Sequence, residues 1–275
     1  MNYDKIEYEI KPVSKFSWGL GELWKYRELL YFFVWRDLKI KYKQTFLGVL
    51  WVVLQPLMLM LIFTFVLGAR LENSIGKVGY PVFFMSGFIL WNFFSSGLTN
   101  AGNGMVSNAG IIKKIYFPRL IIPVSSVLSA TIDLFVGFLL YIIILIFYKP
   151  DFNVFNFIYL PLSIILTFSA SLGLGIIISS LNIKYRDFRY LLPFLIQFLL
   201  FVSPVIYVLS FDSVYLNFLV SLNPMYAPIE LFRSHLANYQ PDIYLISISV
   251  FVNLLFCFFG IFYFRKTESY FADLA

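Results

Sequence analysis

The sequence is poor in cysteine, histidine and charge. Its 275 residues include one cysteine, Cys257, and one histidine, His235. A single cysteine excludes an internal disulfide and a cysteine-rich metal site, and a single histidine excludes a histidine cluster. No metal site is therefore expected.

Several enzyme motifs are also missing. The sequence has no G-x-x-x-x-G-K-[ST] phosphate-binding loop, no G-x-S-x-G and no H-E-x-x-H. The chain therefore cannot cradle ATP in a phosphate-binding loop. We expect no catalytic residue and no cofactor in this chain, so transport or scaffolding remains, with any energy source on another chain.

Apolar residues dominate what is present. Charged residues make up 13% and hydrophobic residues 60%, whereas about a quarter of an ordinary soluble domain is charged. Six stretches approach the roughly 20 apolar residues that a spanning helix needs, and open sheets leave backbone groups unpaired in lipid. The prediction is an all-α integral membrane protein with six transmembrane helices, at about 47–68, 80–98, 121–148, 158–181, 190–209 and 243–264.

Lysine and arginine set the expected orientation. With the N-terminus inside, 17 of them lie on the inner side and 4 on the outer side, and cytoplasmic loops carry the excess. Both termini are therefore expected in the cytoplasm, and no cleavable signal peptide is expected because the first residues lack an apolar core. The predicted organisation is a cytoplasmic N-terminus (1–46), a six-span domain (47–264) and a cytoplasmic tail (265–275).

Residues 19–45 predict an amphipathic helix at the membrane interface. At 100° per residue, an apolar stripe lies beside a basic stripe, which suits the inner headgroup layer. The alternative is a basic stretch that only fixes topology. The residues assigned to this interface helix are Trp35, Arg36, Lys39, Tyr42 and Lys43, with Leu38 in the apolar stripe.

The segment 210–242 is too apolar for a free loop and too short for two spans. Pro224, Pro228 and Pro241 interrupt it. We expect two short re-entrant helices between spans five and six, broken near Asn223-Pro224 and dipping into the outer leaflet. The alternative is a cap on the membrane surface.

Asp133 is the only acid within a predicted span. A carboxylate at this depth should face protein or water. One interpretation is an acid that lines a pore or bonds another helix. The other is a structural acid capped by Ser125 and Ser129, two turns and one turn earlier on the same face.

Other polar and small residues in the spans have mainly structural interpretations. Gln55 and Gln197 either line a wet path or bond neighbouring helices, with the second favoured. Ser171, Gly175 and Ser179 recur every four residues, a spacing that lets helices approach closely, so packing is favoured there.

Aromatic residues make up 21% of the chain. Sugar C–H faces stack on aromatic rings, and such contacts would suit a sliding polymer, although each single ring is more easily explained by packing. The rings predicted near a translocation path, together with Asp133, are Phe88, Trp91, Phe94, Phe198 and Tyr207.

Five stretches carry motifs that together resemble one known family. The first, RDLKIKYKQTFLGVLW (36–51), resembles the start of the first span in type-2 ABC exporter permeases of the O-antigen and teichoic-acid branch. NAGIIKKIYFP (108–118) and NIKYRD (182–187) resemble its N-x-x-[LI]-[IV]-x-K-x-x-F-P and N-x-x-[FY]-R-D loops. The tail (264–268 and 271–273) matches too, and Asn223-Pro224 falls where the family's outer gate helices break.

The resemblance implies a homodimeric channel that exports undecaprenyl-linked polysaccharide across the bacterial inner membrane. Two separate ATPase subunits would bind ATP and Mg²⁺, and the other partners would be membrane lipids, with no nucleic acid. The loop between spans two and three would supply the coupling helix, and Asn223 and Pro224 the gate. The coupling residues implied are Asn108, Ile111, Ile112, Lys114, Phe117 and Pro118.

Three other function classes stay open at this point. A secondary transporter would need intramembrane ion-coupling groups, and only Asp133 is available. A membrane-embedded transferase would need a histidine or acid constellation at the membrane face. A type-2 permease for drugs or small lipids fits the topology, but the aromatic content and the interface helix count against it.

Overall fold

The computed structural model describes residues 20–43, 48–75, 78–185, 187–208, 213–237, 239–268 and 271. Every regular element in these ranges is helical, apart from one isolated antiparallel bridge between Phe152 and Leu236. The all-α prediction is confirmed for this part of the chain.

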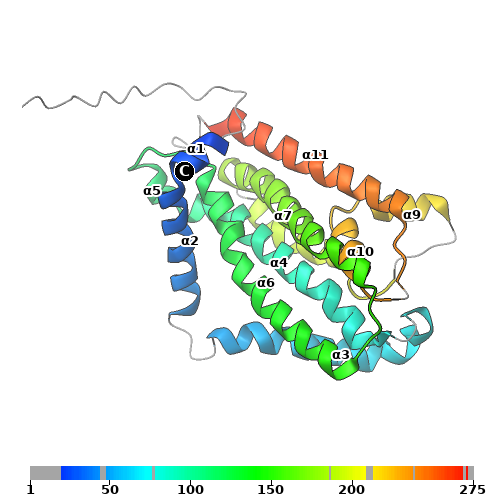
Figure 1. Ribbon diagram of the computed structural model, residues 1–275. Helices are drawn as coiled ribbons and strands as arrows, with labels where there is room; N and C mark the ends of the chain where they lie inside the picture. The colour runs from blue at the N-terminus through cyan, green and yellow to red at the C-terminus, as the bar shows by residue number, and fades with distance from the viewer. Residues whose placement is uncertain are drawn as a thin grey trace, which may run out of the picture.

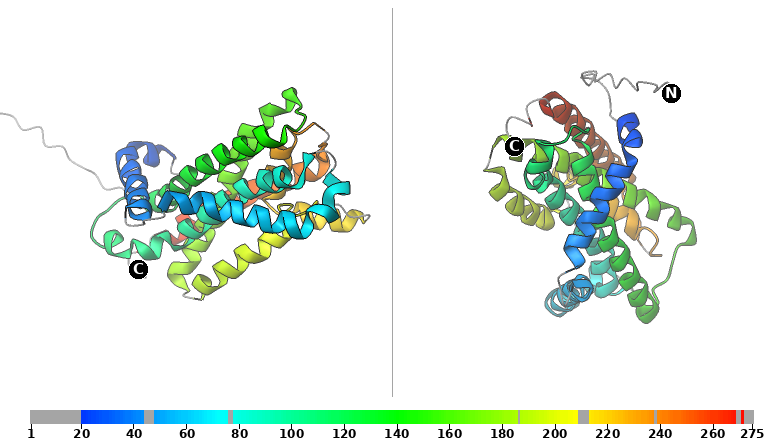
Figure 2. Two further views of the ribbon diagram at one scale, coloured as in Figure 1. Left: turned by 90° about the horizontal axis from the view of Figure 1, so that it is seen from below. Right: turned by 90° about the vertical axis from the view of Figure 1, so that its left-hand side faces the viewer.

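Five helices in the described ranges are long and apolar enough to cross a membrane. They are α3 (Gly48–Ile75), α4 (Tyr80–Ser107), α6 (Ile121–Tyr148), α7 (Tyr159–Lys184) with the 3-10 turn η2 (Val154–Ile158), and α11 (Ile243–Thr267). Figures 1 and 2 show them as one elongated bundle. In α4, 78% of the most apolar window is buried, but only 11% of the window in α3, so α4 is central and α3 peripheral.

The fifth predicted span is shorter than expected. Helix α8 (Phe188–Val202) has 15 residues, about 22 Å at 1.5 Å per residue. It ends because Ser203 is extended ahead of Pro204, and a residue before proline avoids the helical region. The chain continues as irregular structure in which Ser203, Val205 and Ile206 are buried.

Small residues bring the central helices together. Ser171, Gly175 and Ser179 are buried on α7, and a Cβ on Gly175 would lie 2.7 Å from the Cβ of Ala101 on α4. On the other side of α7, a Cβ on Gly173 would lie 2.7 Å from the backbone nitrogen of Cys257 on α11. The packing interpretation of these small residues is confirmed.

Five further helices lie at the two ends of the bundle. Helix α1 (Leu20–Lys25), α2 (Arg27–Tyr42) and α5 (Ala109–Ile112) gather at the end where α11 finishes, and α9 (Val214–Ser221) and α10 (Tyr226–Arg233) lie at the opposite end (Figure 1). The single helix predicted over 19–45 is broken into α1 and α2 at Tyr26, whose φ and ψ are −102° and 27°. The two helices predicted within 210–242 are present, with the break at Asn223-Pro224 between them.

Candidate functional site

Helix α2 is fastened to the bundle through Asp133. The side chain of Asp133 is 4% exposed on α6 and forms an ion pair with Lys41. The Tyr42 hydroxyl donates to the same carboxylate at 2.7 Å, and Ser96 Oγ on α4 lies 3.5 Å away. Burial, and then the hydrogen bond to Asp133, raises the pKa of the Tyr42 hydroxyl, so the hydroxyl stays protonated and donates.

Of the two interpretations of Asp133, the bond to another helix is confirmed. Ser125 and Ser129 do not cap the carboxylate, because their hydroxyls donate to the carbonyls of Ile122 and Ser126 in their own helix. This is the usual outcome for serine within a helix. Tyr42, predicted to lie in the apolar stripe, instead faces Asp133.

Replacing Asp133 by asparagine should loosen α2 without unfolding the bundle. The amide oxygen can still accept from Tyr42, but Lys41 loses its charged partner, at a cost of about 1–3 kcal/mol. The measurement is thermal unfolding of the purified chain, with Asp37→Asn as control, because Asp37 forms only a local pair with Arg36 on the same helix. Equal unfolding midpoints for the two variants would show that the Lys41 pair does not hold α2.

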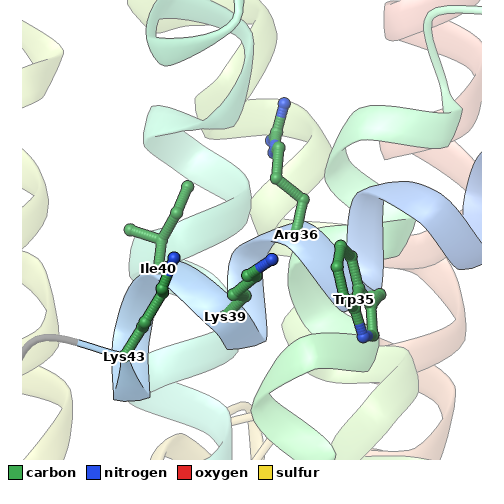
Figure 3. Close-up of a pocket in the computed structure, with 5 residues that line it drawn as sticks. All are labelled: Trp35, Arg36, Lys39, Ile40 and Lys43. Carbon is green, nitrogen blue, oxygen red and sulfur yellow. The ribbon is translucent and has the colours of Figure 1, made fainter.

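The free side of α2 combines aromatic rings with cations. Trp35 and Ile40 are 45% and 71% exposed, and the Lys39 ammonium lies 4.5 Å from the centre of the Trp35 ring. With Arg36 and Lys43 these residues line an open pocket of about 390 Å³ (Figure 3). Four of the five residues predicted for the interface helix therefore line one basic pocket, and the fifth, Tyr42, anchors the helix.

The loop after α4 separates into buried ends and an exposed tip. Of the predicted coupling residues, Asn108, Ile112, Phe117 and Pro118 are buried, Ile111 is half-buried and Lys114 is exposed. The Asn108 amide donates to the Gly104 carbonyl at 2.8 Å and so caps α4. The sequence motif identified the loop but not its outward face, which also includes Ile115 and Tyr116, each 62% exposed.

At the opposite end, Asn223 and Pro224 form a buried turn. Asn223 Nδ2 donates to Ser203 Oγ at 2.8 Å, and its carbonyl accepts from Ser249 Oγ on α11 at 2.7 Å. Asn253 of α11 lies 3.4 Å from the Pro224 carbonyl. The break between α9 and α10 is thus fastened both to α11 and to the chain that follows α8.

Helix α10 is held by Arg233, one of the four lysine and arginine residues on the predicted outer side. The Arg233 side chain is fully buried and donates to the carbonyls of Phe83, Pro204 and Val205 and to Ser86 Oγ. Its guanidinium also lies 3.6 Å from the centre of the Phe83 ring. Glu230, 3.9 Å away, is buried, and burial raises the pKa of its carboxyl. By contrast, α9 exposes Val214, Tyr215 and Leu219.

The aromatic residues predicted near a path occupy different environments. Phe88, Trp91 and Phe94 on α4 are at most 6% exposed and pack within this chain, and Trp91 lies 5.3 Å from Phe94 between ring centres. Phe198 on α8 is 55% exposed, and Tyr207 is half-buried with its hydroxyl donating to the Phe201 carbonyl. Within this single chain, Phe198 is the most accessible of the five rings.

A polar stripe on α4 escaped the sequence analysis. The other faces of α4 pack on α6, α7 and α8, where Ile89 meets Gly137, Ala101 meets Gly175, and Gly102 meets Leu192. The remaining face of its second half is only half-buried and carries hydroxyls and amides. These residues are Asn92, Ser95, Ser96, Thr99 and Asn103. Their spacing of three and four residues could have revealed the stripe.

The chain belongs to the ABC-2 type transporter family, whose family model matches residues 28–237. It is similar to the O-antigen export system permease protein RfbA of Klebsiella pneumoniae, with 28% identity over 264 residues, covering 94% of this chain and 98% of the relative. The protein of the same name from Myxococcus xanthus is 27% identical, covering 90% and 96% of the two chains. The polysialic acid transport protein KpsM of Escherichia coli is 25% identical, covering 72% and 77%.

Proposed function

We propose that this chain is the membrane-spanning permease subunit of an ABC transporter that exports lipid-linked polysaccharide, such as O-antigen or teichoic acid, across the bacterial inner membrane. The observation that carries the proposal is the similarity to O-antigen export permeases over 94% of this chain. The missing phosphate-binding loop supports a separate subunit for ATP hydrolysis. Two copies of this chain and two ATPase subunits make up the proposed transporter.

The proposed topology has six spans and both termini in the cytoplasm. Arg265 at the end of α11 forms an ion pair with Glu22 of α1 at 2.8 Å, so the two ends of the described chain meet. Ends on one side require an even number of crossings, which five long helices cannot supply alone. Helix α8 completes the set if the irregular residues 203–208 finish its crossing. Their burial in protein favours this, because irregular backbone at membrane depth needs such cover.

Helix α2 lies in the inner headgroup layer in this proposal. Figure 1 shows α2 crossing the end of the bundle, while the left view of Figure 2 shows α3 running along it. Exposed Trp35 and Ile40 suit the acyl boundary, and Lys39 and Lys43 suit lipid phosphates. At the other end, α10 acts as the fixed part of the outer gate and the exposed α9 as its movable part.

The second copy covers the open faces of α3 and α8. Both helices pack on α4 and expose apolar side chains, including Phe65 at 91% and Phe194 at 66%. Gln55 and Gln197 are exposed on these faces, and among the described residues neither amide bonds a neighbouring helix. In this proposal the polar stripe of α4, defined above, lines the path with groups that suit uncharged sugar hydroxyls.

The test is to express this chain with an ABC ATPase encoded beside it and to purify the pair. We expect a stable complex with vanadate-sensitive ATP hydrolysis, and intracellular accumulation of lipid-linked polymer in cells that lack this chain. Export that needs no ATPase and follows the proton gradient would overturn the proposal. A cysteine at Lys113, in a Cys257→Ala background, should react with a membrane-impermeant reagent only after cells are opened.

A further inference from the structure

The end of α11 is joined to α1 and to the loop after α5 by one set of polar contacts. Arg265 donates through Nη2 to Glu22 at 2.8 Å and through Nη1 to Glu268 at 2.8 Å. The other oxygen of Glu268 accepts the backbone N–H of Arg119 at 3.0 Å, and the Arg119 guanidinium donates to the Glu268 carbonyl. Glu268 therefore contacts both the last long helix and the loop.

These contacts lie over an apolar cluster shared by the same elements. Phe264 and Phe271 are at most 1% exposed, with ring centres 5.0 Å apart. Phe117 of the loop and Phe33 of α2, 5.7 Å apart between ring centres, belong to the same cluster. The loop therefore packs on buried aromatic rings and is hydrogen-bonded to Glu268.

The ion pair between Glu268 and Arg265 is more buried than an ordinary surface ion pair. Exposed pairs contribute only about 0–1 kcal/mol, but the Arg265 side chain is 2% exposed and that of Glu268 is 13% exposed. Removing one partner of a buried pair leaves an uncompensated charge. Arg119 follows the exposed tip (113–116) by three residues, so its backbone bond to Glu268 sets where the tip leaves the protein.

We propose that Glu268 is a positioning residue that, with Arg265 and Arg119, fixes the tip relative to α11. Movement of the tip is then passed to the last span and to α1 together. This inference deepens the proposed function and rests on it, because the tip is taken as the ATPase contact. In this proposal the tail motif, through Glu268, holds the coupling loop in position against α11.

The first test needs no transport assay. Lys113 and Lys114 are exposed trypsin sites on the tip, and local loosening of a segment speeds its proteolysis. In the purified full chain, Glu268→Ala should raise cleavage there by about tenfold, which corresponds to about 1.4 kcal/mol, and Glu268→Asp should lie between the variant and the parent. Lys266→Ala, at an exposed position one turn or less away, is the control. Equal cleavage of Glu268→Ala and Lys266→Ala would overturn the inference.

The second test uses the complete transporter with its ATPase. We expect Glu268→Ala to assemble and hydrolyse ATP but to export about tenfold less polymer per ATP, while Lys266→Ala keeps the parental ratio. A parallel fall of hydrolysis and export, with the ratio unchanged, would assign Glu268 a merely structural role and overturn the inference. Failure of the parent chain to bind the ATPase would instead contradict the proposed function. The proteolysis experiment would still test whether Glu268 positions the tip, because it needs no ATPase.

Discussion

Arg233→Leu is expected to prevent stable folding of the outer end of the bundle. The substitution leaves three buried carbonyls and one hydroxyl without their donor and removes the positive charge beside Glu230. Breaking a buried charged pair costs about 3–5 kcal/mol, a large part of the 5–15 kcal/mol that holds a typical protein together. The measurement is the yield and unfolding midpoint of the purified membrane protein.

Two further variants separate geometry from charge. Arg233→Lys keeps the charge but cannot reach four acceptors with one ammonium, so it should recover only part of the loss. Arg70→Leu makes the same exchange at an exposed position on α3 and should change the midpoint little. If Arg233→Leu folded as well as Arg70→Leu, the buried guanidinium would not be what holds α10.

The long helices follow from composition, whereas their breaks depend on particular residues. Runs of about 20 apolar residues predict α3, α4, α6, α7 and α11, because a helix needs that length to cross the hydrocarbon core of a membrane. The early end of α8 could also have been predicted from the sequence, because Ser203 precedes Pro204 and a residue before proline avoids the helical region. The break at Tyr26 has no such mark in the sequence, and we have no physical account of it.

The hydrogen-bond partners of Arg233 could not be predicted from a local sequence pattern. Its acceptors come from Phe83, 150 residues away, and from Val205, 28 residues away, so only the folded chain assembles them. The same holds for Asp133, whose partner Lys41 is 92 residues distant. The sequence indicated that this acid needs a partner. Of the two interpretations left open, capping by the nearby serines is wrong because both hydroxyls bond their own helix.

The residues predicted for coupling divide into two kinds in the structure. Ile112 and Phe117 support the loop from within, and Lys114 and Ile115 face outward. The sequence motif does not distinguish the two kinds, because burial depends on the folded chain. Changes over Asn108–Ile112 would therefore disturb the loop itself, and the ATPase contact is better tested at the tip.

Ile115→Asp is expected to abolish export while leaving the chain folded. Ile115 is 62% exposed, so a carboxylate there stays solvated in the free chain, but it would be buried in a contact with the ATPase. Loss of an apolar anchor at a protein interface costs about 2–4 kcal/mol, equivalent to roughly 30- to 1,000-fold in affinity. The ATPase should no longer co-purify, and polymer export should fall to background.

The matched control is Tyr244→Asp, which places the same charge at a 65% exposed position near the start of α11, at the opposite end of the bundle. Ile112→Asp serves as the opposite reference, because it buries the carboxylate in the apolar cluster of the loop and should lower the unfolding midpoint. Ile115→Asp should match the parent in unfolding and fail only in ATPase binding and export. Normal ATPase binding by that variant would mean that the tip is not the contact, and the motor would have to engage another part of this end of the bundle.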